Sequence, residues 1–100
     1  SIWSPLPLAI LQKVLEGIAK EDFNAIARNA NLLVGYSQAA GWMAQQSPDY
    51  TRFTADFRRQ AQNLVSEARR KNVDGATVAY FQLTISCVNC HKFIRGDSVL

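Results

Sequence analysis

The fold is decided by residues 48–71, which read PDYTRFTADFRRQAQNLVSEARRK. Apolar residues recur in this stretch at steps of three and four, which is the spacing of one face of an α-helix. Residues 47–49 are typical of a turn followed by a helix start, and the basic run 69–71 suits the last turn, where the helix dipole favours positive charge. We therefore expect one long helix whose buried stripe consists of Tyr50, Phe53, Phe57, Ala61, Leu64, Val65 and Ala68.

Two shorter helices are predicted before this stretch. Pro5 and Pro7 are compatible with the start of the first helix but not with its interior. Its apolar face is expected to consist of Leu8, Leu11, Leu15 and Ile18. Negative charge at 21–22 suits the first turn of the second helix, which should end near Gly41. Its stripe is expected to be Phe23, Ile26, Ala27, Ala30, Leu33 and Val34. The alternative is a three-helix arrangement in which these two helices merge.

A fourth helix is predicted after residues 72–75, which interrupt the pattern and offer Asp74 as a helix cap. The residues on its expected face are Tyr80, Leu83, Thr84, Cys87, Cys90, His91 and Ile94. Four helices with short connections imply antiparallel neighbours. We thus expect an all-α fold, an antiparallel up-down-up-down four-helix bundle, with residues 1–100 forming a single domain.

Composition excludes several classes of protein. Of the 100 residues, 48% are hydrophobic and 19% are charged, which indicates a globular domain and not a disordered chain. The longest apolar stretches, such as 6–11, are too short to span a membrane. The net charge is +3, but acidic residues interrupt the basic clusters at 58–59 and 69–71, which favours a solvated helix face over nucleic-acid binding. Ser1 at the first position, with no leader before it, indicates a mature or trimmed form.

The strongest motif is Cys87-Val88-Asn89-Cys90-His91, a Cys-x-x-Cys-His sequence. On a helix its two cysteines and its histidine fall at i, i+3 and i+4, so the three side chains leave the same face. Two thiols placed in this way can bond to the two vinyl groups of a haem while the histidine binds the iron. The motif therefore predicts one covalent haem c, with His91 as the metal ligand.

Other interpretations of the motif explain less. A structural zinc site needs four ligands, whereas the chain has two cysteines and one histidine, so a carboxylate or a second subunit would have to contribute. A thioredoxin-like pair normally lies at the start of a helix, where the dipole lowers a thiol pKa, but this pair lies late in the predicted helix. Two buried thiols, or a disulfide, beside a neutral histidine would account for the residues but not for their spacing.

The motif near the C-terminus, with the basic residue Arg95 four positions after His91, makes the chain resemble the cytochrome c′ family, as a compact or divergent member. This resemblance implies a four-helix bundle with the motif on its last helix, Arg95 close to the histidine and the haem, a periplasmic or exported location, and a homodimer formed through the first two helices. Family members often have an aromatic residue three positions after the histidine, where this chain has Ile94.

The sixth ligand of the iron decides between the functions that the resemblance implies. Met43 is the sole methionine and falls at the expected end of the second helix, whereas six-coordinate bundle cytochromes place a methionine on the first helix. We therefore expect five-coordinate iron with Leu8 or Leu11 as the blocking residue on its open side. Phe57 and Leu83 are expected to pack against the porphyrin, although apolar residues on such stripes are core residues by default.

Three functions remain open on this basis. The leading hypothesis is a non-enzymatic haem protein that binds a diatomic gas such as nitric oxide or carbon monoxide, or transfers electrons to a redox partner that the sequence does not name. The sequence contains no second histidine, and it offers no polar group on the open side of the iron of the kind that helps to cleave peroxide. The alternatives are a six-coordinate electron carrier with Met43 as a ligand, and a haem-free helical interaction domain whose Cys-His cluster binds metal through a dimer.

Overall fold

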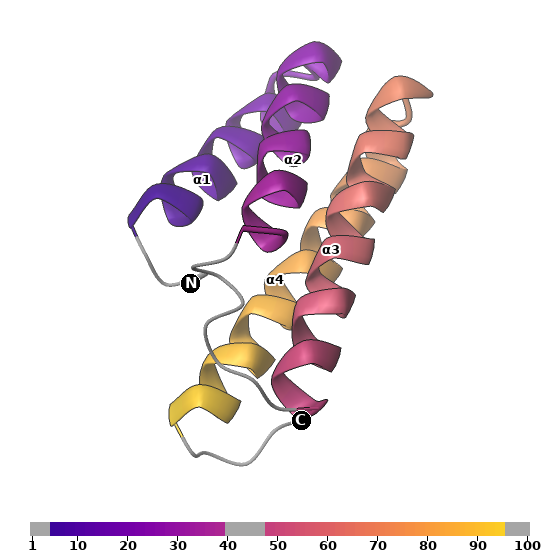
Figure 1. Ribbon diagram of the computed structural model, residues 1–100. Helices are drawn as coiled ribbons and strands as arrows, with labels where there is room; N and C mark the ends of the chain where they lie inside the picture. Colours follow the sequence, from indigo (N-terminus) through magenta and orange to yellow (C-terminus); the bar gives the residue numbers. More distant parts are fainter. Residues whose placement is uncertain (1–4, 40–47, 96–100) are drawn as a thin grey trace.

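The computed structural model describes residues 5–39 and 48–95, with side chains described for 7–39 and 48–93. These residues form α1 (Pro5–Ala19), α2 (Phe23–Ser37), α3 (Pro48–Arg69) and α4 (Val73–Arg95), and no strand occurs among them (Figure 1). The prediction of an all-helical fold is confirmed. The alternative in which the first two helices merge is wrong, because the chain turns between α1 and α2. No helix in the described ranges is long and apolar enough to cross a membrane.

The turns after α1 and after α3 share one backbone design. Glu21 and Lys71 adopt left-handed backbone conformations, with φ of 52° and 56°. The next amide in each turn donates to a carbonyl of the preceding helix, from Asp22 to Gly17 at 2.8 Å and from Asn72 to Glu67 at 3.0 Å. This is the Schellman type of helix ending, which satisfies carbonyl groups that the helix leaves unpaired.

The residue after each left-handed position caps the next helix. The Asp22 carboxylate accepts a hydrogen bond from the Ala25 amide at 3.1 Å at the start of α2. At the start of α4, Asn72 Oδ1 accepts from the Gly75 amide at 3.0 Å. The prediction of Asp74 as the cap is therefore wrong: Asp74 lies in the first turn of α4 and is exposed. Asn72 is better placed because its side chain also donates to Glu67 of α3 at 2.7 Å.

The core lies along α3, which packs against both α2 and α4. All seven residues of the predicted α3 stripe are buried, and Phe57 and Leu64 are almost fully enclosed. Polar contacts fix the neighbours of α3 as well. Arg58 donates to the hydroxyl and the carbonyl oxygen of Ser37 at the end of α2, each at 2.9 Å. The interpretation of residues 58–59 as a solvated face is thus wrong for Arg58, which ties α3 to α2.

The buried side of α1 differs in part from the predicted one: Leu11 and Ile18 are half-buried and pack against the core, as expected. Leu8 and Leu15 are 37% and 51% exposed. Gly17 explains this rotation of the helix, because a Cβ atom on it would lie 2.9 Å from Cγ1 of the buried Ile26. The helix therefore turns its glycine toward α2 and buries the residues in line with it, which are Pro7, Ile10 and Val14.

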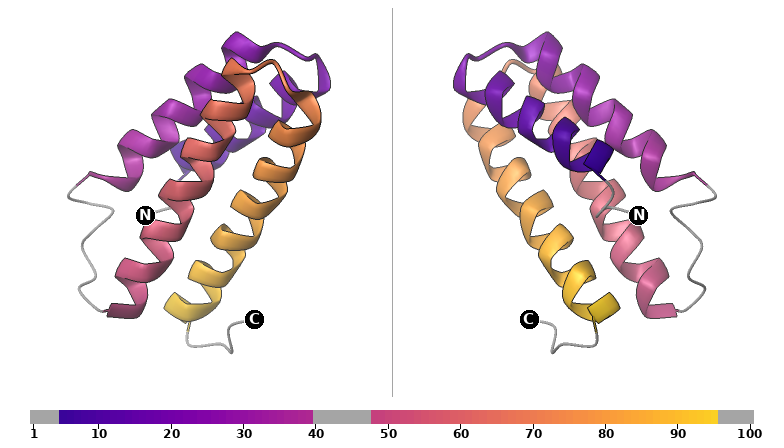
Figure 2. Two further views of the ribbon diagram at one scale, coloured as in Figure 1. Left: turned by 90° about the vertical axis from the view of Figure 1, so that its right-hand side faces the viewer. Right: turned by 90° about the vertical axis from the view of Figure 1, so that its left-hand side faces the viewer.

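The helices differ in length. At about 1.5 Å per residue, helices of the length of α1 and α2 span roughly 22 Å, and helices of the length of α3 and α4 span roughly 33 Å. The N-terminal part of α3 and the C-terminal part of α4 therefore extend beyond the ends of α1 and α2 (Figures 1 and 2). The Cys-x-x-Cys-His motif belongs to this C-terminal part of α4.

Replacing Asn72 with alanine should lower the free energy of unfolding by about 0.5–2 kcal/mol, as is usual for the loss of a helix cap. Asp74→Ala is the matched control and should cost less at low protein concentration, because within one copy of the chain Asp74 contributes only its charge near the helix start. Urea denaturation followed by circular dichroism measures both. Equal losses in the two variants would contradict the assignment of the cap to Asn72.

Phe57→Ala should destabilise the fold by about 3–5 kcal/mol, because it leaves a cavity in the packed core. Phe81 is a phenylalanine on α4 with 64% of its surface exposed, so Phe81→Ala should change the stability by less than about 1 kcal/mol. The same denaturation experiment, at low protein concentration, compares the two. A small loss in Phe57→Ala would show that the core is not centred on α3.

Candidate functional site

The three side chains of the motif lie in the second half of α4. Cys87 and Cys90 are buried, at 6% and 3% exposure, and His91 is half-buried. Both cysteines are free thiols, so the structure contains no disulfide between them. The spacing of one helical turn therefore gives two thiols that face the core, with the histidine next to them at its edge.

Burial keeps both thiols in the neutral form. It raises the pKa of Cys87 to about 12, with a further contribution from the charge of Cys90. Burial likewise raises the pKa of Cys90 to about 11. A thioredoxin-like cysteine needs the opposite shift, toward a stable thiolate. This arrangement argues against a redox-active dithiol and leaves two protonated thiols one turn apart.

Each thiol has a tyrosine near it. Tyr50 lies near Cys90 and Tyr80 near Cys87. The pKa of each tyrosine is raised first by burial and then by the charge of the neighbouring cysteine. The Tyr80 hydroxyl donates to the Leu11 carbonyl oxygen at 3.3 Å, which joins α4 to α1. The rings of Phe53 and Phe93 have centroids 5.4 Å apart and are tilted by 49°. The motif thus lies in an apolar setting with hydroxyl groups at its edge.

The structure brings some of the predicted site residues together. Phe57 and Leu83 belong to the same buried cluster as the two cysteines, and Leu11 packs against that cluster while half-buried. Leu8 is exposed and is not part of the cluster. Arg95 ends α4, but its side chain lies outside the described residues, as does the whole of Met43.

A polar edge of the site was not anticipated from the sequence. Ser86 donates to the Asp56 carboxylate of α3, which also pairs with Arg59. Asn89, between the two cysteines, has a buried Oδ1 with no hydrogen-bond partner among the described residues. The sequence contained a signal for this polar edge, because residues 86, 89 and 93 are spaced by three and four positions. On a helix such residues share one side, and in α4 this is the side toward α3.

The residues present fit a covalently bound haem in their chemistry. They supply two neutral thiols on one face, an adjacent imidazole and an apolar surrounding, which are the groups that attachment requires. A hollow of about 340 Å³ is lined by Arg52, Phe53, Asp56, Arg59 and Asn89, among others. It borders the motif through Asn89, and neither thiol lines it. A haem at the thiols would therefore replace part of the packing that now covers them.

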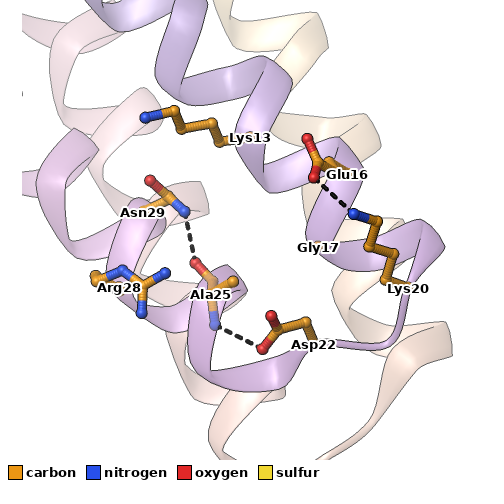
Figure 3. Close-up of a pocket in the computed structure, with 8 residues that line it drawn as sticks. All are labelled: Lys13, Glu16, Gly17, Lys20, Asp22, Ala25, Arg28 and Asn29. Atoms are coloured by element: carbon orange, nitrogen blue, oxygen red, sulfur yellow. Dashed lines mark hydrogen bonds and ion pairs between the residues drawn. The ribbon is translucent and has the colours of Figure 1, made fainter.

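A second hollow lies between α1 and α2, and no residue of α4 lines it (Figure 3). It has a volume of about 320 Å³, and both positive and negative side chains line it. Within it Lys20 pairs with Glu16 at 2.8 Å, and Asn29 donates to the Ala25 carbonyl oxygen at 2.8 Å. No predicted site residue lines this hollow. In the described part of the chain, no three His, Cys, Asp or Glu side chains gather so that they could hold a metal ion.

Comparisons with protein families, with curated proteins and with solved structures found no match to this chain.

The raised thiol pKa values predict a loss of stability in alkaline solution. The unfolded chain releases thiol protons near the ordinary pKa of 9, whereas the folded chain holds them until about 11 to 12. The contribution of the thiols is therefore complete below pH 9 and is lost as the pH rises through 11 to 12. Urea unfolding at pH 8 to 11 should show a steeper decline for the haem-free protein than for Cys87→Ser/Cys90→Ser. Parallel curves would contradict the burial of the thiols.

Proposed function

We propose that this chain is a c-type haem protein of the cytochrome c′ type, with one haem c bound through Cys87 and Cys90 and with His91 as the iron ligand. The supporting observation is the set of two buried, neutral thiols one turn apart on α4, with the half-buried histidine beside them. When bound, the haem supplies an iron that binds nitric oxide or carbon monoxide, or exchanges electrons. No catalytic activity is proposed.

The other residues of the site have distinct roles in this proposal. Phe57 and Leu83 provide part of the apolar wall around the haem, since both are fully buried in the core cluster that includes the two cysteines. Leu11 is a better candidate than Leu8 for the residue that covers the open side of the iron. Leu11 is half-buried, and its carbonyl oxygen accepts a hydrogen bond from the Tyr80 hydroxyl. Arg95 would lie close to the histidine and the haem, as the resemblance to the family implies.

We further infer that the four helices form an antiparallel up-down-up-down bundle. Three contacts between α3 and α4 support this inference, because residue numbers rise along one helix as they fall along the other. Phe53 contacts Phe93, Asp56 binds Ser86, and Glu67 binds Asn72 just before α4. An exported or periplasmic location follows from the proposal itself, because bacteria attach haem c outside the cytoplasmic membrane.

The second candidate function is a six-coordinate electron carrier with Met43 as the sixth ligand. One observation favours it: α2 ends at Ser37 rather than near Gly41, and α3 begins at Pro48, five positions after Met43 in the sequence. The first turn of α3 holds Tyr50, which lies near Cys90. Met43 is thus close in sequence to a residue that borders the motif.

Replacing Cys87 and Cys90 with alanine should abolish covalent haem when the protein is produced with a c-type haem maturation system. The measurement is the haem absorbance that remains with the protein after unfolding and extraction with acidified solvent. Val88→Ala, a change at a spacer position of the motif, is the control and should retain haem. Covalent haem in the double alanine variant, or none in the unaltered chain, would overturn the proposal.

Visible spectra of the reduced haem-loaded protein distinguish the two candidates. Five-coordinate iron predicts a broad high-spin spectrum that shifts on addition of carbon monoxide and is unchanged by Met43→Ala. The electron carrier predicts sharp low-spin bands that carbon monoxide leaves unchanged, and a change to high spin in Met43→Ala. Low-spin bands that persist in Met43→Ala would exclude both assignments of the sixth position.

A further inference from the structure

One side of α4 carries a stripe of exposed apolar side chains. Phe81 and Val78 expose 64% and 57% of their surface, and Ile85 and Val88 expose about two fifths. The four positions follow at steps of three, four and three, so they form one continuous line along the helix. α3 and α1 pack against α4, and Figure 2 shows no further helix beside it. Water-exposed apolar stripes of this spacing are typical of helix–helix contact surfaces.

Opposite charges mark the two ends of this α4 stripe. Asp74 lies four residues before Val78, and Lys92 lies four residues after Val88, so both continue the same line. No aspartate, glutamate, lysine or arginine occurs between them on α4. The line is also symmetric in the sequence about position 83. Val78 and Val88 are equally far from that centre, as are Phe81 and Ile85 and the two charged ends.

We propose that the α4 stripe binds the same stripe of a second copy of this chain, with the two α4 helices antiparallel about a two-fold axis near position 83. Val78 then faces Val88 of the partner subunit, and Phe81 faces Ile85 of the partner subunit. Asp74 faces Lys92 of the partner subunit at both ends. Such a contact is self-complementary, as a two-fold interface has to be.

The charges at the ends of the α4 stripe favour a second copy of this chain as the partner, and they favour an antiparallel orientation of the two helices. A parallel pairing would place each Asp74 beside its equivalent and each Lys92 beside its equivalent, and both contacts are repulsive. A negatively charged lipid surface favours helices flanked by cations at both ends, which the carboxylate of Asp74 opposes. The stripe differs from the dimer surface that the family resemblance implies, which involves the first two helices. The inference uses described side chains of α4 alone and does not depend on haem.

Charge reversal tests the proposal. Asp74→Lys places two lysines together at each end of the interface, and Lys92→Asp places two aspartates together. Each variant alone should associate about tenfold more weakly than the unaltered chain at low salt, because two attractive pairs become repulsive. A mixture of the two variants should associate as strongly as the unaltered chain, since every end then pairs a lysine with an aspartate. Sedimentation velocity over a range of concentrations measures these associations.

Two apolar variants complete the experiment. Phe81→Glu should make the chain monomeric, whereas Leu32→Glu, at an exposed leucine of α2, should leave association unchanged. Circular dichroism confirms that each variant is folded. The proposal is overturned if the unaltered chain is monomeric at all concentrations, if Leu32→Glu weakens association as much as Phe81→Glu, or if the mixture of charge variants associates no better than each variant alone.

Discussion

The packing of α3 between α2 and α4 is the constraint on which the rest of the structure depends. Its apolar stripe supplies the three buried aromatic side chains of the described core, Tyr50, Phe53 and Phe57, so the positions of α2 and α4 are set by contact with it. Polar groups at the edges of the stripe then fix the alignment. Arg58 holds the last turn of α2 through Ser37, and Asp56 holds α4 through Ser86. Together these contacts determine which face of α4 is buried, and hence that Cys87 and Cys90 face the core.

The burial of the two cysteines changes their chemistry. In water a thiol loses its proton near pH 9, but Cys87 and Cys90 keep theirs well above that value because the apolar core disfavours a charge. Neutral thiols are poor metal ligands and slow reductants, because the thiolate is the reactive form. The half-buried His91 adds an imidazole that still reaches the edge of the core. Burial therefore disfavours ionic or redox chemistry at the two cysteines.

Much of the fold was predictable from the sequence, because regular spacing of apolar residues decides which face of a long helix is buried. The entire α3 stripe was predicted correctly, and so was the burial of Leu83 and the two cysteines on α4. The errors come from contacts between helices, which spacing alone does not encode. Gly17 allows α2 to approach and so rotates α1 away from its leucine face, and Asn72 acts as the cap because Glu67 lies within its reach. The neighbours of Asn89 depend in the same way on how α4 lies against α3.

The tight turn between α3 and α4 also has a consequence for the order of events during folding. Contacts close to a short turn between two helices are local in sequence and form early, whereas the contacts of Phe53 with Phe93 and of Tyr50 with Cys90 join residues 40 positions apart and form only as the pair closes along its length. Closure of this helix pair brings Tyr50, Phe53 and Phe57 over the face that holds Cys87 and Cys90. A large molecule can reach the two sulfur atoms only while the pair is open. Any covalent modification of these cysteines by such a molecule therefore competes with folding and has to act on a chain whose last two helices have not yet closed together.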